Sequence, residues 1–210
     1  MSEVLKTGTT TLGLVCKEVI VLAADKRATA GDMIVQKKAQ KIFKLADNLA
    51  VTVAGTVSDV QLLIKLVKAE LKLKEVRIGR RAGVKEAANL LANYVYTNIR
   101  NFSIIPGVTH FLIGGNDETG LHLYDIFPDG SVTEVDDYVS SGSGSVFVYG
   151  VLESSYKPAM DEKEAVDLAA KSVNASLQRD TGSGNGLDIW VIDKNGIRIA
   201  MEKVITQKVI

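Results

Sequence analysis

The sequence predicts an α+β fold in which two antiparallel sheets pack face to face and a layer of helices covers each outer surface. Three observations support this four-layer αββα sandwich. Apolar and β-branched runs open and close the chain, and amphipathic helical patterns stand between them. The segments lack the regular strand–helix alternation that gives a parallel sheet. Two sheets between helical layers would bury both the helix stripes and the apolar strands.

The opening third of the chain has the composition of β-strands. Strands are expected over residues 9–17, 20–24 and 48–54, because each run is rich in β-branched or apolar residues and is interrupted by polar residues or glycine. The link Lys17-Glu18-Val19 lacks the glycine that favours a tight turn, and Val19 is an awkward turn residue. The sequence therefore leaves the geometry of the first hairpin open.

Two amphipathic helices follow. Ser58 or Asp59 could cap the first. Its apolar face consists of Val60, Leu63, Val67 and Leu71. The second is expected over residues 84–102, before Pro106 and Gly107 stop it. Its stripe consists of Val84, Ala88, Leu91, Val95, Ile99 and Phe102. Two successive helices of this kind are expected to cover one sheet.

A hairpin and a further helix come next. Residues 109–114 and 121–127 have strand composition and flank a turn-prone stretch, residues 115–120. Asp161, with Glu164 three residues later, resembles a capping box that starts a helix running to about Leu177. The apolar face of this helix consists of Val166, Ala170, Val173 and Leu177.

One segment is ambiguous and the chain end is not. Residues 145–155 contain Val146, Phe147 and Tyr149, which favour a strand, whereas the spacing of Val148 and Leu152 permits a helix. The last two strands are expected over residues 187–193 and 197–202. The Asn-Gly pair between them, at residues 195 and 196, favours a hairpin because it accepts positive φ.

Composition indicates one domain of 210 residues, since no linker-like stretch divides the chain and its three prolines are scattered. Lys plus Arg equals Asp plus Glu at 25 each, so no excess charge favours nucleic acid or a membrane surface. There is no run of about 18 apolar residues and no signal-peptide pattern. We therefore expect a cytoplasmic protein that binds neither nucleic acid nor membrane.

Cysteine and histidine argue against disulfides, metals and other cofactors. Cys16 is the only cysteine and lies in an apolar stretch without a nearby histidine, so it is expected to pack in the core. His110 and His122 are the only histidines, and neither belongs to a cluster at metal-ligand spacing.

The basic stretch of residues 66–81 is expected to be a solvated face, with a subunit contact as the alternative.

Three polar segments stand where strands would favour apolar residues: Gly8-Thr9-Thr10-Thr11, the Asp-Lys-Arg of residues 25–27, and the lysine-rich residues 37–43. Taken singly, they indicate the start of a strand, a solvated turn and a solvent-facing charge run. A catalytic interpretation needs a nucleophile, a base and a charge partner brought together by the fold.

Taken together, these segments resemble the β subunits of the 20S proteasome, which are N-terminal-nucleophile hydrolases. Asp25 lies 16 positions after Thr9, and Lys41 lies 32 positions after it. This is the spacing of that family's nucleophile, acid and lysine. The similarity continues at residues 53–55, at the glycine-serine turn 141–145 and at Arg-Asp-Thr-Gly-Ser-Gly, residues 179–184. The resemblance implies the four-layer sandwich of that family and a helix over residues 145–155.

The resemblance also implies catalytic roles. Thr9 would be the nucleophile, and its α-amine the base, once the Gly8–Thr9 bond is cut. Lys41, held charged by Asp25, would favour the neutral amine and the developing alkoxide. The N–H of Gly55 would stabilise the oxyanion. The residues implied to support Thr9 and its amine are Ser143, Asp180 and Ser183. Ser143 is flanked by Ser141 and Ser145 in a repeating pattern.

The same resemblance implies that residues 1–8 are a propeptide removed by attack of Thr9 on Gly8, and that residues 9–210 are the protease domain. Unfolded polypeptide would pair as an added strand with the segments around Thr29 and Gly55. The primary pocket would be lined by small apolar side chains, which favour hydrophobic P1 residues: Ala28, Ala39 and Val53.

As partners, the resemblance implies α subunits and β subunits in stacked heptameric rings, with an ATPase ring that delivers substrate. Two alternatives remain: a non-catalytic structural β subunit, and a related hydrolase of small amides. The retention of Thr9, Asp25 and Lys41 argues against the first. Residues 179–184 argue against the second.

Overall fold

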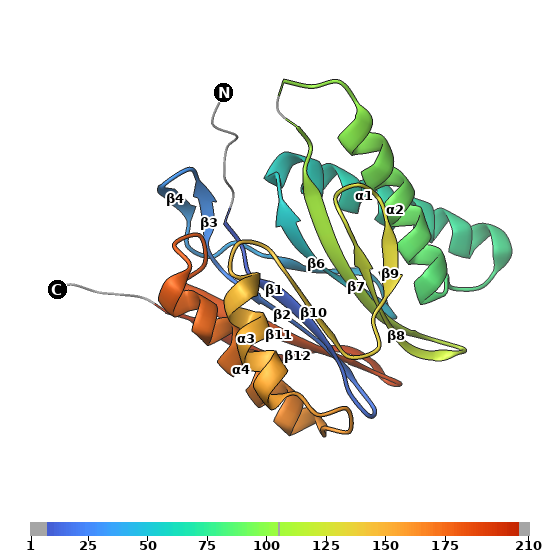
Figure 1. Cartoon of the computed structure of the whole chain (residues 1–210). Helices are drawn as coiled ribbons and strands as arrows, with labels where there is room; N and C mark the ends of the chain where they lie inside the picture. Colours follow the sequence, from blue (N-terminus) through green and yellow to red (C-terminus); the bar gives the residue numbers. More distant parts are fainter. Residues whose placement is uncertain (1–7, 105, 206–210) are drawn as a thin grey trace.

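Two five-stranded antiparallel sheets form the centre of the molecule, and a pair of helices covers the outer face of each (Figure 1). The computed structural model describes residues 8–104 and 106–205. The predicted α+β, four-layer αββα sandwich is confirmed. Most of the predicted propeptide, residues 1–7, lies outside the described residues.

The first sheet has the strand order β10-β1-β2-β11-β12 and contains the first and last strands, β1 and β12. Its strands are β1 (Thr11–Val15), β2 (Ile20–Asp25), β10 (Tyr138–Ser141), β11 (Gly186–Asp193) and β12 (Gly196–Val204). The open question of the first hairpin is answered by a short turn. Lys17 and Glu18 are exposed there, and the Cys16 N–H donates to the Val19 carbonyl at 3.0 Å.

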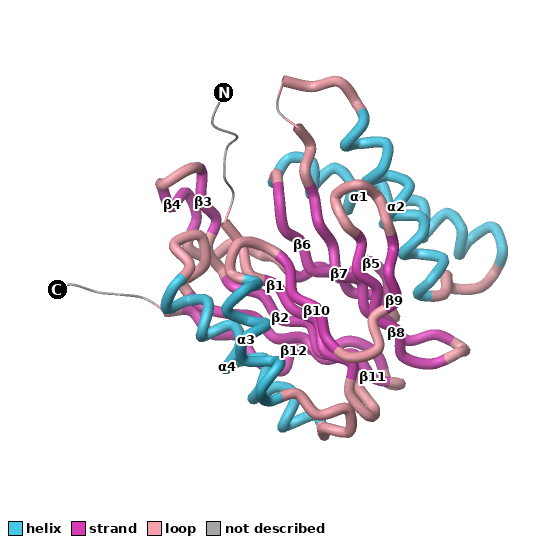
Figure 2. Tube along the Cα trace, in the orientation of Figure 1, coloured by secondary structure: helices cyan, strands magenta, loops and turns pink. Residues whose placement is uncertain are grey.

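The second sheet has the strand order β5-β6-β7-β8-β9. Its strands are β5 (Ile42–Ala46), β6 (Leu49–Gly55), β7 (Thr109–Asp117), β8 (Gly120–Ile126) and β9 (Val132–Glu134). Between β2 and β5 the chain forms a separate two-stranded ribbon, visible in Figure 2. Its strands are β3 (Ala28–Ala30) and β4 (Met33–Gln36). Strands β3, β4, β5, β9 and β10 were not among the predicted elements.

The helices lie where the apolar periods require them. Helices α1 (Val57–Ile78) and α2 (Val84–Arg100) cover the second sheet, and α3 (Ser145–Ser155) and α4 (Glu162–Arg179) cover the first (Figure 1). The ambiguous segment 145–155 is therefore a helix. All four apolar residues predicted on the inner face of α1 are buried. Asp161 and Glu164 form the predicted capping box at the start of α4.

Three details of the helical and turn predictions were wrong. Helix α1 is preceded by Thr56 as N-cap, so Ser58 and Asp59 lie inside the first turn. Helix α2 ends at Arg100, and the side chain of Phe102 is fully exposed instead of extending the buried stripe. The turn expected over residues 115–120 is much shorter, because β7 continues to Asp117 and β8 begins at Gly120.

Cys16 packs in the core between the first sheet and helices α3 and α4, as predicted. Burial raises the pKa of its thiol to about 11, so the reactive thiolate is scarce at neutral pH. We therefore expect Cys16 to resist alkylation by iodoacetamide in the folded protein and to react fully in denaturant. Mass spectrometry of the alkylated protein checks this. Rapid labelling without denaturant would contradict the burial of Cys16.

Candidate active site

Strand directions bring four of the predicted residues to one end of the sandwich. Thr9 precedes β1 and Lys41 precedes β5, whereas Asp25 is the last residue of β2 and Gly55 the last of β6. Strand β1 is antiparallel to β2, and β5 is antiparallel to β6. The start of one strand in each pair therefore lies beside the end of the other. A strand-start lysine and a strand-end carboxylate from opposite sheets can therefore meet there.

Thr9 is buried and hydrogen-bonds both Gly8 and Ser143. Its hydroxyl donates to the Gly8 carbonyl oxygen at 2.6 Å, and its amide N–H donates to Ser143 Oγ at 3.2 Å. The Gly8 N–H donates to Thr29 Oγ1 at 2.8 Å. The hydroxyl of Thr9 is thus held directly against the carbonyl group that precedes it.

Asp25 and Lys41 form a buried ion pair beside this bond. Lys41 Nζ lies 2.6 Å from Asp25 Oδ1, and the two side chains are 6% and 0% exposed. Lys41 Nζ also lies 3.5 Å from the Gly8 carbonyl oxygen. The Asp25 carboxylate accepts three backbone N–H groups at 2.9 Å, from Thr10, residue 27 and Gly184. These bonds and the Lys41 ion pair satisfy the buried carboxylate and fix its orientation.

The two effects on Lys41 oppose one another. Burial lowers the pKa of the Lys41 ammonium, whereas the neighbouring Asp25 carboxylate raises it, and the net direction is down. Lys41 is among the buried residues, although its segment taken alone has the composition of a solvent-facing charge run. It releases its proton more readily than an exposed lysine would.

Asp180 is the centre of a second hydrogen-bonded group. Its Oδ2 accepts from Ser143 Oγ at 2.7 Å and from Ser183 Oγ at 2.5 Å. Ser183 Oγ also lies 2.6 Å from Thr10 Oγ1. The chain of contacts therefore runs from the Thr9 N–H through Ser143 to Asp180, and from Thr10 through Ser183 to the same carboxylate. The middle serine of residues 141–145 is the one that reaches Thr9.

Sequence reasoning missed the part played by Thr10. This side chain is completely buried and hydrogen-bonds Ser183, while its backbone N–H bonds Asp25. Its place in the threonine run was the available signal, because alternate residues of a strand face opposite sides and Thr10 must point away from Thr9. Thr10 joins the two groups of polar residues.

Glycines allow the backbone to approach closely here. A Cβ on Gly8 would lie 2.1 Å from the Cα of Gly182, and one on Gly142 would lie 2.2 Å from the Thr9 carbonyl oxygen. Gly55 combines a φ of +119° with a Cβ position 2.1 Å from the Val108 carbonyl oxygen. Only glycine fits these positions without movement of the backbone.

A pocket of about 240 Å³ opens beside Thr9. The predicted pocket residues Ala28, Thr29, Ala39 and Val53 all line it, together with Gly55. Its further lining residues, which sequence reasoning did not identify, are Gln36, Gln40, Phe43, Val57, Val60 and Gln61. The last three stand at helical spacing in the first turns of α1, so the helix period and the proximity of Gly55 were the available signals.

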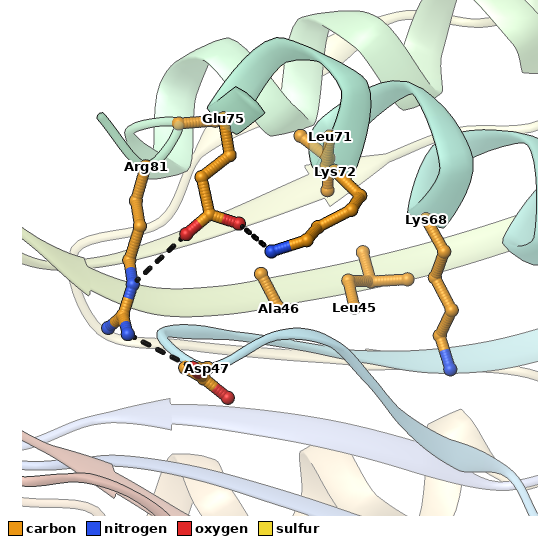
Figure 3. A pocket seen from close by; sticks show the side chains of 9 residues that line it. Leu45, Ala46, Asp47, Lys68, Leu71, Lys72, Glu75 and Arg81 are labelled. Atoms are coloured by element: carbon orange, nitrogen blue, oxygen red, sulfur yellow. Dashed lines mark hydrogen bonds and ion pairs between the residues drawn. The ribbon is translucent and has the colours of Figure 1, made fainter. Parts of the chain in front are cut away.

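A smaller cavity of about 150 Å³ lies elsewhere, between β5 and α1 (Figure 3). Leu45, Ala46 and Leu71 line it beneath a rim of charged side chains. Lys72 Nζ bonds Glu75 at 2.7 Å, and an Arg81 nitrogen lies 3.0 Å from Asp47. The basic stretch of residues 66–81 is thus exposed and partly ion-paired, and it contributes nothing to the surroundings of Thr9.

Each histidine is paired with a carboxylate. His110 Nε2 lies 2.6 Å from Asp125, and His122 Nδ1 lies 2.8 Å from Glu134. Within residues 8–104 and 106–205, no group of three or more His, Cys, Asp or Glu side chains is arranged to hold a metal. Over the same residues, no helix combines the length and the apolar character needed to cross a membrane.

Known proteins resemble this chain over nearly its whole length. The model of the family described as "Proteasome subunit" matches residues 5–192. "Proteasome subunit beta" of Ferroglobus placidus is 41% identical over 198 residues, covering 94% of this chain and 92% of that protein. The protein of the same name from Methanoregula boonei is 42% identical over 199 residues, covering 95% and 92%. That from Archaeoglobus fulgidus is 41% identical over 195 residues, covering 93% and 90%. This chain therefore belongs to the proteasome subunit family and is a β-type subunit.

Proposed function

We propose that this chain is a threonine-type endopeptidase of the 20S core, with Thr9 as its nucleophile after self-cleavage between Gly8 and Thr9. The observation that carries the proposal is the Thr9 hydroxyl, 2.6 Å from the Gly8 carbonyl oxygen and beside the buried Lys41–Asp25 pair. Membership of the proteasome family supports a role in proteolysis and assembly with α subunits.

The proposed self-cleavage uses groups already in contact. Thr9 Oγ1 bonds to the carbonyl carbon of Gly8, the C–N bond to Thr9 breaks, and the hydroxyl proton passes to the released nitrogen. The product is an ester with a free α-amine. Water then adds to the ester, returns a proton to Thr9 Oγ1 and leaves a carboxyl group on Gly8. Lys41 Nζ, 3.5 Å from the Gly8 carbonyl oxygen, stabilises the negative charge that develops there.

The α-amine of Thr9, freed by the cleavage, then supplies the base that the threonine hydroxyl needs. An α-amine has an unperturbed pKa near neutrality, so it accepts the hydroxyl proton as Thr9 attacks a substrate carbonyl. The peptide bond breaks, the amine gives the proton to the leaving nitrogen, and an acyl-enzyme remains. Water hydrolyses this ester with the same amine as base. Lys41 and Asp25 keep the amine neutral and stabilise the alkoxide.

Backbone and side-chain hydrogen bonds complete the proposed site. The N–H of Gly55 is assigned to the oxyanion, and the glycine allows a substrate backbone to approach. Ser143, Asp180 and Ser183 orient the Thr9 amine and the hydrolytic water. The contact of the Thr9 nitrogen with Ser143, and of Ser143 with Asp180, supports this assignment.

Pocket composition supports a preference for hydrophobic P1 residues in unfolded polypeptides. Ala28, Ala39 and Val53 are small and apolar, and no acidic or arginine side chain lines the pocket beside Thr9 within the described part of the chain. The segments around Thr29 and Gly55 would pair with the substrate backbone as an added strand.

The proposed setting is a closed chamber. Two heptameric β rings, flanked by α rings and served by an ATPase ring, would confine cleavage to unfolded chains that enter it, in the cytoplasm. Self-cleavage before assembly would expose an unconfined protease, so processing is expected to accompany assembly.

The intact mass of this chain after assembly with its α subunit tests the proposal, with Thr9→Ala as the control. We expect the unmodified chain to lose residues 1–8 and the Thr9→Ala chain to retain them, because alanine has no hydroxyl to attack Gly8. If both chains keep residues 1–8 in assembled particles, the chain is a structural subunit. If both lose them, another protease removes the segment.

A further inference from the structure

Lys26 is buried next to the proposed active site, yet the proposed reaction does not use it. Its side chain is 7% exposed and directs Nζ at two carboxylates, 2.7 Å from Asp188 Oδ1 and 2.9 Å from Glu202 Oε1. Asp188 lies in β11 and Glu202 in the edge strand β12. Lysine is rarely buried unless it is paired in this way. The side chain therefore links the end of β2 to its neighbour β11 and to β12, the strand beyond β11.

The backbone of the same residue reaches both sides of the proposed site. The Lys26 N–H donates to the Gly184 carbonyl at 3.2 Å, and the Lys26 carbonyl accepts from the Ala39 N–H at 2.9 Å. Gly184 follows Ser183 and itself donates to Asp25 at 2.9 Å. Ala39 lines the pocket beside Thr9. A displacement of Lys26 would therefore move the Ser183 turn and one pocket wall together.

Loss of the ion pair between Lys26 and Asp188 is expected to destabilise this part of the first sheet. Asp188 is 8% exposed, and burial raises the pKa of its carboxyl group against the opposing influence of Lys26. The charged groups that face it are Lys26, from the end of β2, and Glu202, from β12. Removing the ammonium would leave two carboxylates facing each other, one of them buried.

From these contacts we infer that Lys26 is a positioning residue of the protease: through Asp188 and Glu202 it fixes the backbone that holds both Gly184 and Ala39. This inference rests on the proposed function, since it assigns Lys26 a role in the same site. The partners of Lys26 are Asp188, Glu202 and the backbone of Gly184 and Ala39. Its effect is exerted through the turn that carries Ser183 and the wall that carries Ala39.

The test compares assembled particles carrying Lys26→Met with particles carrying Lys203→Met, which makes the same chemical change at an exposed lysine of β12. Activity is measured per assembled particle with a peptide that has a hydrophobic P1 residue. We expect Lys26→Met to lower kcat/KM roughly ten- to a hundredfold, with kcat falling and KM rising, because small misplacements of catalytic groups are costly. Lys203→Met should match the unmodified particle.

A second variant separates the tether from the unpaired charge. Lys26→Met alone should lose further activity as the pH rises, because Asp188 must then ionise without its cation. Lys26→Met/Asp188→Asn removes that charge, so it should assemble and lose the extra pH dependence, while kcat/KM stays roughly tenfold low because the tether is gone. Lys26→Arg keeps a cation and should retain most of the activity.

The outcomes distinguish this inference from the proposed function. If the unmodified particle cleaves peptides and both Lys26→Met and the double variant match it in kcat and KM, the positioning role is wrong and the protease stands. If these variants only reduce the yield of particles, Lys26 is structural and the inference is again overturned. If the unmodified particle neither processes nor cleaves, both the inference and the proposed function fail.

Discussion

Replacing Lys41 by methionine is expected to lower kcat/KM of the processed particle roughly 10²–10⁴-fold and to prevent removal of residues 1–8. The ammonium is 2.6 Å from Asp25 and 3.5 Å from the carbonyl oxygen of the bond that breaks in the proposed self-cleavage, so it can stabilise the charge that develops there. Peptide hydrolysis is measured with chains produced to begin at Thr9, and processing with the full sequence by intact mass.

The matched control for Lys41→Met is Lys38→Met, an exposed lysine three positions earlier. Lys41→Met also leaves the Asp25 carboxylate buried and unpaired, which destabilises the fold by itself. Lys41→Met/Asp25→Asn removes both charges and should fold better than the single variant while remaining inactive. A double variant that cleaves peptide as fast as Lys38→Met would show that the pair has no part in the reaction.

Replacing Gly55 by alanine is expected to destabilise the fold by about 2–5 kcal/mol, from backbone strain and overpacking combined. The new Cβ would lie 2.1 Å from the Val108 carbonyl oxygen, so the end of β6 must move away from the start of β7. In particles that still assemble, displacement of the proposed oxyanion donor should lower kcat roughly 10²–10³-fold. Thermal unfolding and kcat are the measurements.

Gly120→Ala provides the comparison for Gly55→Ala. Gly120 has a φ of +123°, close to the +119° of Gly55, but a Cβ there meets nothing within 4 Å. It lies in the β7–β8 turn, far along the sheet from the end of β6. Gly120→Ala should therefore carry the backbone strain alone and leave kcat unchanged. Equal losses of stability in the two variants would mean that crowding at Val108 does not contribute to the destabilisation of Gly55→Ala.

Local pattern predicted the long elements well and the short strands poorly. Helix α1 was predictable because its buried face repeats at 3.6 residues over many turns. Strand β4 could not be, since its four residues are all exposed and no alternation marks them. Strand β10 pairs with β1, joining Leu12 to Ser140 across most of the chain. Such pairing depends on the assembled sheet, which no window of sequence contains.

The same contrast applies to the site. The residue types of the Thr9, Asp25 and Lys41 segments were visible, but taken singly they favoured a strand, a turn and a solvated charge run, and only the resemblance joined them. Their meeting depends on two sheets stacking with strand ends aligned. The contact of Ser143 with Thr9 depends on the β1–β10 pairing, and so does its distinction from Ser141. These contacts depend on tertiary structure and cannot be predicted from local sequence.

The close contact of Gly8 with Gly182, and the hold of Thr29 on the Gly8 N–H, have a consequence for timing. On the proposed mechanism, Gly8 lies in the path of the substrate backbone and acts as a tethered competitive inhibitor. A tethered occupant has an effective concentration of the order of millimolar, which dilute substrates cannot outcompete. If Thr9 cleaves the chain as proposed, an uncut subunit is inactive towards other substrates, and its first reaction, performed on itself, is the one that admits every later substrate.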